Sequence, residues 1–141
     1  PARAAAYRTR AKQEAARLSA LHAELRKTLA PVRGTPVVTF HGAWAYWSRA
    51  YGPKIAAVVE PFPGKEPSAR YVREVVDLLR SKGARAVFAE PQLPVAPARV
   101  IAESAGVKLL VVAPEGDARH RDYFDMMRAN AQVFLKALGR P

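Results

Sequence analysis

A histidine and two glutamates each follow directly after a short apolar run in this sequence. His41 follows the run at 37–40, Glu60 the run at 55–59 and Glu90 the run at 86–89. The carboxyl ends of parallel strands lie at one edge of a sheet, and ligands bind beyond that edge. An imidazole and carboxylates there can exchange protons or hydrogen-bond to a ligand. The sequence therefore predicts one polar edge, to which a fourth run, 108–112, brings Glu115.

Structural roles for these side chains stay open at this point. His41 could hydrogen-bond a neighbouring loop. Glu60 and Glu90 each precede a proline, which holds a residue extended, and they could accept hydrogen bonds from loop amides. Two further histidines are predicted to be structural. His120 is expected to be a solvent-facing residue at a helix start, and His22 a packing or surface residue of a long helix.

Nothing in the sequence supplies an activated nucleophile. The chain has no cysteine, and neither Gly-x-Gly-x-x-Gly nor Gly-x-Ser-x-Gly occurs. Gly64-Lys65 precedes a helical stretch, but the phosphate-loop pattern is absent, and Ser68 is predicted to be a helix cap instead. The chain is therefore not expected to be an enzyme.

Strand and helix patterns alternate along most of the chain. Near-continuous apolar runs predict buried parallel strands at 37–40, 55–59, 86–89 and 108–112. Helical periodicity predicts helices at 43–51, 68–81, 94–104 and 121–138. This order is typical of an α/β protein, so we expect a three-layer α/β/α lobe with a four-stranded parallel sheet. A long helix over residues 1–30 precedes it.

The net charge of +11 raises nucleic-acid binding as an alternative. In residues 1–30, seven Lys and Arg stand against two Glu, yet few aromatic residues interleave with them. An apolar stripe at helical spacing instead indicates a helix with solvated basic faces; it comprises Tyr7, Ala11, Leu18, Leu21, Leu25 and Leu29. No Ser, Thr, Asp or Asn precedes this helix as a cap, so the chain is expected to continue upstream.

Several longer segments share a pattern with one family. They are Phe40-His41-Gly42-Ala43-Trp44-Ala45-Tyr46-Trp47, Val59-Glu60-Pro61, Val87-Phe88-Ala89-Glu90-Pro91-Gln92 and the segment 123–130. In this order they resemble the zinc-type substrate-binding proteins of metal ABC importers, a zinc/manganese family whose strand-one segment reads Phe-His-Asp-Ala-(aromatic)-x-Tyr. Residues 1–30 are similar to the long backbone helix of that family. The resemblance covers essentially the whole chain.

The resemblance implies a two-lobed receptor that captures a divalent metal between its lobes. This chain would supply the linking backbone helix, residues 1–33, and the C-terminal α/β lobe, residues 34–141, with the N-terminal lobe missing. His41 matches the metal ligand of the C-terminal lobe, and imidazole there favours Zn²⁺ over Mn²⁺. Gly42 and Ala113 replace aspartates that are common in the family, and alanine cannot ligate. One histidine cannot complete a tetrahedral zinc site, so a complete site is not expected within this chain.

The implied receptor works in the periplasm or tethered outside the membrane, and it delivers Zn²⁺ to an ABC importer permease. Without its other lobe, the long helix would expose part of its apolar stripe, so a homodimer through this helix is expected. No nucleic-acid partner is expected under this hypothesis. Two alternatives remain: a basic α/β module that binds nucleic acid or an acidic partner, and a receptor lobe that has lost metal binding. The roles of Glu60, Glu90 and Glu115 stay open.

Overall fold

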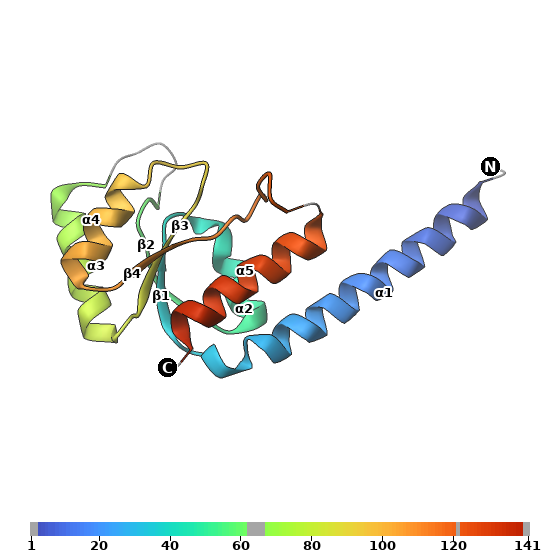
Figure 1. The fold of residues 1–141 in the computed structure, drawn as a ribbon, viewed down its shortest axis with the longest axis horizontal. Helices are drawn as coiled ribbons and strands as arrows, with labels where there is room; N and C mark the ends of the chain where they lie inside the picture. The colour runs from blue at the N-terminus through green and yellow to red at the C-terminus, as the bar shows by residue number, and fades with distance from the viewer. Residues whose placement is uncertain (1–2, 62–66, 121, 140–141) are drawn as a thin grey trace.

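The first helix is the longest element of the chain. The computed structural model describes residues 3–61, 67–120 and 122–139. Helix α1, Ala4–Thr28, spans 25 residues and extends well beyond the α/β body (Figure 1). No side chain caps its first turn. It ends where Pro31 enters the short 3₁₀ turn η1, Ala30–Val32, after which Gly34 adopts a φ of 76° and turns the chain into the sheet.

Four parallel strands form the central sheet in the order β2-β1-β3-β4. They are β1 (Pro36–Thr39), β2 (Lys54–Val58), β3 (Ala86–Ala89) and β4 (Lys108–Val111). The two central strands are short apolar runs that are almost entirely buried, because helices cover both faces of the sheet. The four predicted strands are confirmed, with ends that differ by one residue at most.

Helices lie on both faces of this sheet. Helix α2 (Ala45–Tyr51), entered through the 3₁₀ turn η2 (Gly42–Trp44), packs with α1 and α5 (Tyr123–Leu138) on one face. Helices α3 (Ala69–Lys82) and α4 (Ala96–Ala105) cover the other face. The predicted three-layer α/β/α lobe is therefore confirmed. Ser68 is the N-cap of α3, as predicted: its hydroxyl accepts a hydrogen bond from the Tyr71 amide at 3.2 Å. The Gly64-Lys65 segment lies outside the described residues.

Helix α5 begins later than the sequence predicts. Its N-cap is Asp122, whose carboxylate accepts a hydrogen bond from the Asp125 amide at 2.8 Å. His120 therefore lies in the loop before α5, and its side chain is only 18% exposed. The prediction of a solvent-facing histidine at the helix start is wrong, because the preceding polar residues fold into a turn around Asp117.

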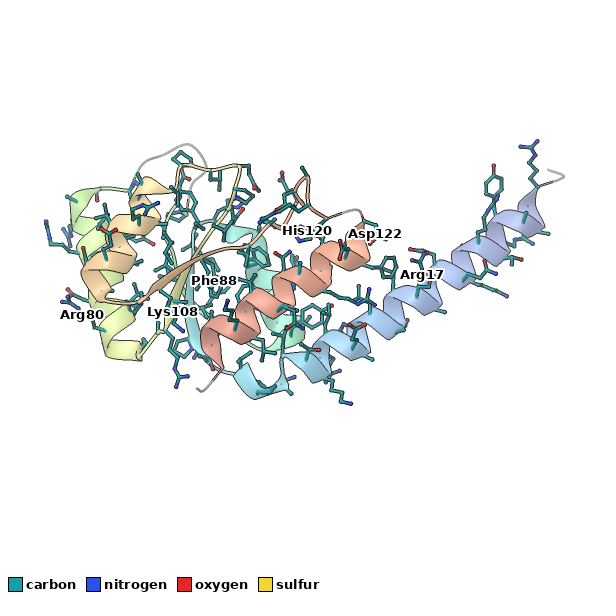
Figure 2. All side chains as sticks on the ribbon, viewed as in Figure 1. Arg17, Arg80, Phe88, Lys108, His120 and Asp122 are labelled. Atoms are coloured by element: carbon teal, nitrogen blue, oxygen red, sulfur yellow. The ribbon has the colours of Figure 1, made fainter. Side chains whose placement is uncertain are left out.

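Aromatic packing supports the segment that follows β1. The Phe134 ring of α5 lies 4.1 Å from the Phe88 ring of β3 and 4.2 Å from the Trp47 ring of α2, between centroids. Trp44 joins the same cluster, 5.4 Å from Phe134. Figure 2 shows Phe88 between the sheet and α5. This cluster fixes η2 and α2, which leave the sheet directly after His41.

Only the second half of α1 packs against the lobe. Leu21, Leu25 and Leu29 are buried against α2 and α5, whereas Tyr7 is 60% exposed and Leu18 is 42% exposed. The predicted apolar stripe is thus a core surface over its last three members alone. The division of the chain at residue 33 and self-association through the exposed half of α1 remain predictions. Light scattering of the chain at high concentration tests the second.

Within the ranges that the structure describes, no helix is long and apolar enough to cross a bilayer.

Candidate metal-binding site

The carboxyl ends of the strands bring His41, Glu60 and Glu90 to one edge of the sheet. Backbone hydrogen bonds continue past the strand ends: the Phe40 amide donates to the Phe88 carbonyl at 2.8 Å, and the Glu60 amide donates to the Phe40 carbonyl at 2.7 Å. After β1 the chain continues to α2 on one face of the sheet, and after β3 it continues to α4 on the opposite face. In open α/β sheets, ligands bind where neighbouring strands diverge in this way, here between His41 and Glu90.

His41 and Glu90 face each other across this point. The His41 Nδ1 and Glu90 Oε2 atoms are 3.6 Å apart, and the two side chains are 33% and 1% exposed. Nδ1 itself is buried and has no hydrogen-bond partner. The solvent-exposed surface of the His41 side chain therefore comes from atoms other than Nδ1. Among the described residues, no hydrogen bond or ion pair engages Nε2, which is the nitrogen left for an external ligand.

Buried polar side chains hold the Glu90 carboxylate in place. Trp44 Nε1 donates a hydrogen bond to Oε1 at 3.1 Å, and Gln92 Nε2 donates to Oε2 at 3.4 Å. Desolvation by burial raises the pKa of Glu90, against the lowering effects of Trp44 and His41. The carboxylate thus accepts its hydrogen bonds from side chains, and not from the loop amides that the sequence left open as donors. The reason is that strand order brings Trp44 over the end of β3.

Glu60 lies on the other side of β1. It is buried, and it lines a hollow of about 350 Å³ between the sheet and helices α3 and α4. Phe40, Val72, Pro94 and Val100 form the apolar part of the same hollow. The structure therefore brings His41 together with Glu90 and places Glu60 in a different environment on the same edge.

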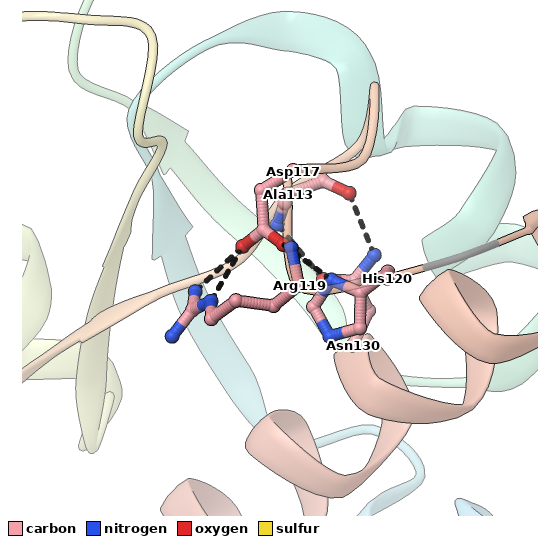
Figure 3. A network of polar contacts seen from close by, with 5 residues as sticks. All are labelled: Ala113, Asp117, Arg119, His120 and Asn130. Carbon is pink, nitrogen blue, oxygen red and sulfur yellow. Dashed lines mark hydrogen bonds and ion pairs between the residues drawn. The ribbon is translucent and has the colours of Figure 1, made fainter.

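The loop after β4 is fixed by a buried asparagine of α5. Asn130 accepts a hydrogen bond from the Ala113 amide at 2.8 Å and donates one to the Ala113 carbonyl at 2.9 Å (Figure 3). Ala113 is 3% exposed, and its methyl side chain offers no ligand atom. The neighbouring Glu115 is exposed and lines an open hollow with Asp117 and His120. Its charge lies close enough to Glu90 to contribute to the raised pKa of Glu90.

A second histidine–carboxylate pair lies in this loop. His120 Nδ1 and Asp117 Oδ1 are 2.8 Å apart (Figure 3), although the N–H direction is not aligned for a hydrogen bond. Arg119 binds the other carboxylate oxygen through Nε at 3.0 Å and Nη2 at 2.6 Å. The hydrogen bonds from Arg119 lower the pKa of Asp117 to about 2. Asp117 is therefore ionised near neutral pH and already engaged by an arginine.

The third histidine lies far along the sequence, on α1. His22 is exposed, and its Nδ1 is 3.3 Å from the Tyr51 hydroxyl of α2. This position agrees with the predicted packing or surface role. Within residues 3–61, 67–120 and 122–139, no three histidine, aspartate or glutamate side chains lie close enough together to hold a metal ion.

Trp44 and Gln92 are site residues that the sequence did not identify. Both were part of motifs, but nothing in their spacing showed that their side chains meet at Glu90, since 46 positions separate Trp44 from Glu90. The available signal was strand adjacency: once β3 is placed beside β1, the residues after both strand ends must approach each other.

Comparison with known proteins identifies the family. Residues 1–137 match the model of the family described as zinc-uptake complex component A, periplasmic. The chain belongs to this family. The resemblance seen in the sequence is therefore confirmed, and the family is one of uptake components rather than of enzymes.

Individual relatives cover most of this chain. The high-affinity zinc uptake system protein ZnuA of Brucella abortus is 32% identical over 116 residues, which are 82% of this chain and 35% of that protein. The protein of the same name from Paracoccus denitrificans is 30% identical over 143 residues, which cover 99% of this chain and 44% of the relative. The chain thus spans less than half the length of these relatives.

Solved structures have the same fold. The laminin-binding adhesin Lmb from Streptococcus agalactiae superimposes with a TM-score of 0.86 at 27% identity, over 98% of this chain and 53% of that one. The SBP FpvC from Pseudomonas aeruginosa, in complex with Mn²⁺, gives a TM-score of 0.80 at 34% identity, with the same coverage of both chains. These neighbours confirm the α/β lobe with its long N-terminal helix.

Proposed function

We propose that this chain is the C-terminal lobe and backbone helix of a two-lobed solute-binding protein that captures Zn²⁺ and delivers it to an ABC importer permease. His41 is the ligand that this lobe contributes, and an N-terminal lobe supplies the others. The protein works in the periplasm or tethered to the outer face of the membrane, and it has no catalytic role. The names of the relatives support uptake of zinc, and the position of His41 supports the site.

One observation carries this proposal. At the carboxyl edge of the sheet, His41 has Nδ1 buried toward Glu90, and its side chain is 33% exposed through its other atoms. A neutral imidazole held by one nitrogen presents the other as a metal ligand. A lobe that leaves one ring nitrogen without an internal partner suits an ion enclosed between two lobes, because a tetrahedral zinc ion accepts ligands from several segments.

The residue types at this edge favour zinc over harder ions. The Glu90 carboxylate faces inward and is 1% exposed, and Ala113 has no ligand atom. Of the described groups nearest the point where β1 and β3 diverge, the imidazole is the one that is presented outward. Imidazole suits Zn²⁺, whereas Mn²⁺ prefers oxygen ligands. We therefore expect Zn²⁺ to bind more tightly than Mn²⁺ in a competition titration of the two-lobed protein.

The test is calorimetric titration of Zn²⁺ into the two-lobed protein with and without His41→Ala. Loss of one of the ligands is expected to weaken binding by roughly a hundredfold or more. His22→Ala is the matched control, since His22 lies on α1 beside Tyr51, and it should leave the affinity unchanged. Unchanged affinity in His41→Ala would refute the site. If the unaltered protein bound no zinc at all, the lobe would belong to a receptor that has lost metal binding.

A further inference from the structure

The Glu90 carboxylate has one acceptor oxygen directed at His41 and one directed at Trp44. Oε1 accepts the Trp44 Nε1 hydrogen bond at 3.1 Å, and Oε2 lies 3.6 Å from His41 Nδ1 and also accepts a hydrogen bond from Gln92 Nε2 at 3.4 Å. Trp44 is 3% exposed and belongs to the aromatic cluster around Phe134, so its indole cannot turn away without disturbing the core. The orientation of the carboxylate is thereby set from the interior of the lobe.

Glu90 is placed to act on the histidine rather than on a metal. Its side chain is 1% exposed, which keeps both oxygens away from the outer side of the edge. Among the described residues, Oε2 is the acceptor that faces the buried Nδ1, and a shift of about 0.5 Å would bring the pair within hydrogen-bond distance. A neutral imidazole carries its proton on one nitrogen only.

We propose that Glu90, held by Trp44, keeps the His41 proton on Nδ1 and so leaves the Nε2 lone pair free for the incoming ion. Glu90 is then a positioning residue for the ligand of this lobe. Nε2 is free before any metal arrives, so binding requires no transfer of the proton between ring nitrogens. That this arrangement serves zinc binding rests on the proposed function. The assignment of the His41 proton to Nδ1 does not depend on it.

The role of Trp44 gives the proposal a sharp consequence for Glu90→Gln. Indole Nε1 is only a donor, so the glutamine must present its carbonyl oxygen to Trp44. Its NH₂ group then faces His41 Nδ1, which must become the acceptor, and Gln92, whose amide can turn its carbonyl oxygen toward that NH₂ group. The imidazole proton moves to Nε2, the nitrogen that faces outward. A near-isosteric substitution is therefore expected to block the metal-binding atom without touching it.

The tautomer is measured by nitrogen NMR of the histidine-labelled chain without metal, at mildly alkaline pH where imidazole is neutral. His41 is expected as the Nδ1–H form in the unaltered chain and as the Nε2–H form in Glu90→Gln. In the double variant Glu90→Gln with Trp44→Phe, the amide is free to turn and the Nδ1–H form should return. Trp44→Phe alone should keep the Nδ1–H form, since the carboxylate offers acceptor oxygens in either orientation.

A merely structural role for Glu90 would not return His41 to the Nδ1–H form in the double variant. The double variant removes more packing than either single variant, so packing losses alone would only add to the disturbance. An Nδ1–H tautomer in Glu90→Gln, or failure of the double variant to restore it, would overturn the proposal. Loss of chemical-shift dispersion in the NMR spectrum would show that Glu90→Gln unfolds the chain. In that case the unaltered chain still tests the proposal, because an Nε2–H tautomer of its His41 would overturn the proposal.

Zinc titration of the two-lobed protein separates this inference from the proposed function. Glu90→Gln is expected to weaken zinc binding roughly 10- to 100-fold, and the double variant to recover most of that loss. If His41→Ala weakens binding while Glu90→Gln leaves the tautomer unaltered, the inference fails and the zinc site stands. If the tautomer changes as expected while His41→Ala leaves zinc affinity unaltered, the zinc site fails and the tautomer control stands.

Discussion

Two histidine–carboxylate pairs lie near the carboxyl edge of the sheet, and their surroundings differ in almost every respect. His41 and Glu90 follow the central strands, and Glu90 is buried under Trp44 with its pKa raised by desolvation. His120 and Asp117 lie in the loop after β4, where Arg119 lowers the pKa of Asp117 to about 2. The first carboxylate is oriented by a neutral donor, and the second is neutralised by a cation.

The difference is the reason why the proposed function assigns the metal to His41 and not to His120. Arg119 occupies one oxygen of Asp117 in a two-point contact, and the His120 side chain is 18% exposed against 33% for His41. Glu90 meets no cation of that kind in the described chain, so its charge is available to the imidazole. A histidine beside a carboxylate therefore becomes a ligand candidate when the carboxylate has no stronger partner and the ring is open on its far side.

The largest predicted effect concerns the aromatic packing beneath the His41–Glu90 pair. Phe134 supports Trp44, which holds Glu90, whereas the hydrogen bonds and ion pairs of the Asp117 side chain in the described residues are all within its own loop. Phe134→Ala is expected to lower the free energy of unfolding by about 3–5 kcal/mol, through lost burial and a cavity. Urea unfolding measures this loss. A loss below about 1 kcal/mol would show that the aromatic cluster does not support the edge.

The second prediction concerns the link between the β4 loop and α5. Asn130→Ala leaves the Ala113 N–H and C=O groups without their buried partner, which should cost about 1–3 kcal/mol of unfolding free energy. Exchange of the Ala113 amide with solvent should accelerate in hydrogen-exchange NMR. Asn130→Leu fills the same volume without the hydrogen bonds. Full stability in the leucine variant would assign the loss to packing alone.

The third prediction uses the opposite signs of the two carboxylate pKa shifts. The pKa of Glu90 is raised from 4.5, so the unfolded chain loses that proton first and stability falls as pH rises above this value. The pKa of Asp117 is lowered from 3.8 to about 2, so its contribution is present above 3.8 and is lost as pH falls toward 2. Urea unfolding measured at several pH values follows both effects. Glu90→Gln should remove the fall of the unfolding free energy above pH 4.5, and Asp117→Asn should remove its fall between pH 3.8 and 2. Slopes of the same sign would contradict the assigned environments.

The smallest effect is expected from Arg119, which is exposed. Arg119→Ala should raise the pKa of Asp117 toward its ordinary range, because the side-chain hydrogen bonds from Arg119 are the main cause of the lowering. Carbon NMR of the Asp117 carboxyl group follows its titration, and the His41 pair should be unaffected. A carboxyl that still titrates near 2 would mean that the loop backbone, through the Arg119 amide, holds the charge.

The sequence was sufficient for the elements and for the gathering of His41, Glu60 and Glu90 at one edge. Apolar runs such as 86–89 have no competing interpretation between the helices that flank them, and every parallel strand ends at the same side. The order of the strands in the sheet could not be predicted from these patterns. It decides that His41 faces Glu90 rather than Glu60, because β3 and β2 lie on opposite sides of β1.

Local polar chemistry was the least predictable part of the candidate site. Periodicity placed the helix at 121–138 and His120 at its start, facing solvent, yet Asp117 accepts the Arg119 amide and starts a turn that partly buries His120. The contact between Trp44 and Glu90 depends on an indole orientation that the packing around Phe134 fixes. Such contacts arise from tertiary structure, and no spacing within a single segment encodes them.

The strand order also determines when this edge can assemble during folding. Val37 pairs with Ile55 across 18 positions and Val87 with Leu109 across 22, whereas the β1–β3 pairing of Val38 with Val87 spans 49. Closing that longest loop costs about 1 kcal/mol more in chain entropy than closing the first. Two separate β-α-β units are thus able to form early, and His41 meets Glu90 only when they join. We expect the histidine to meet its carboxylate partner when these two units join, so a lobe in which they have not joined would lack the contact between His41 and Glu90.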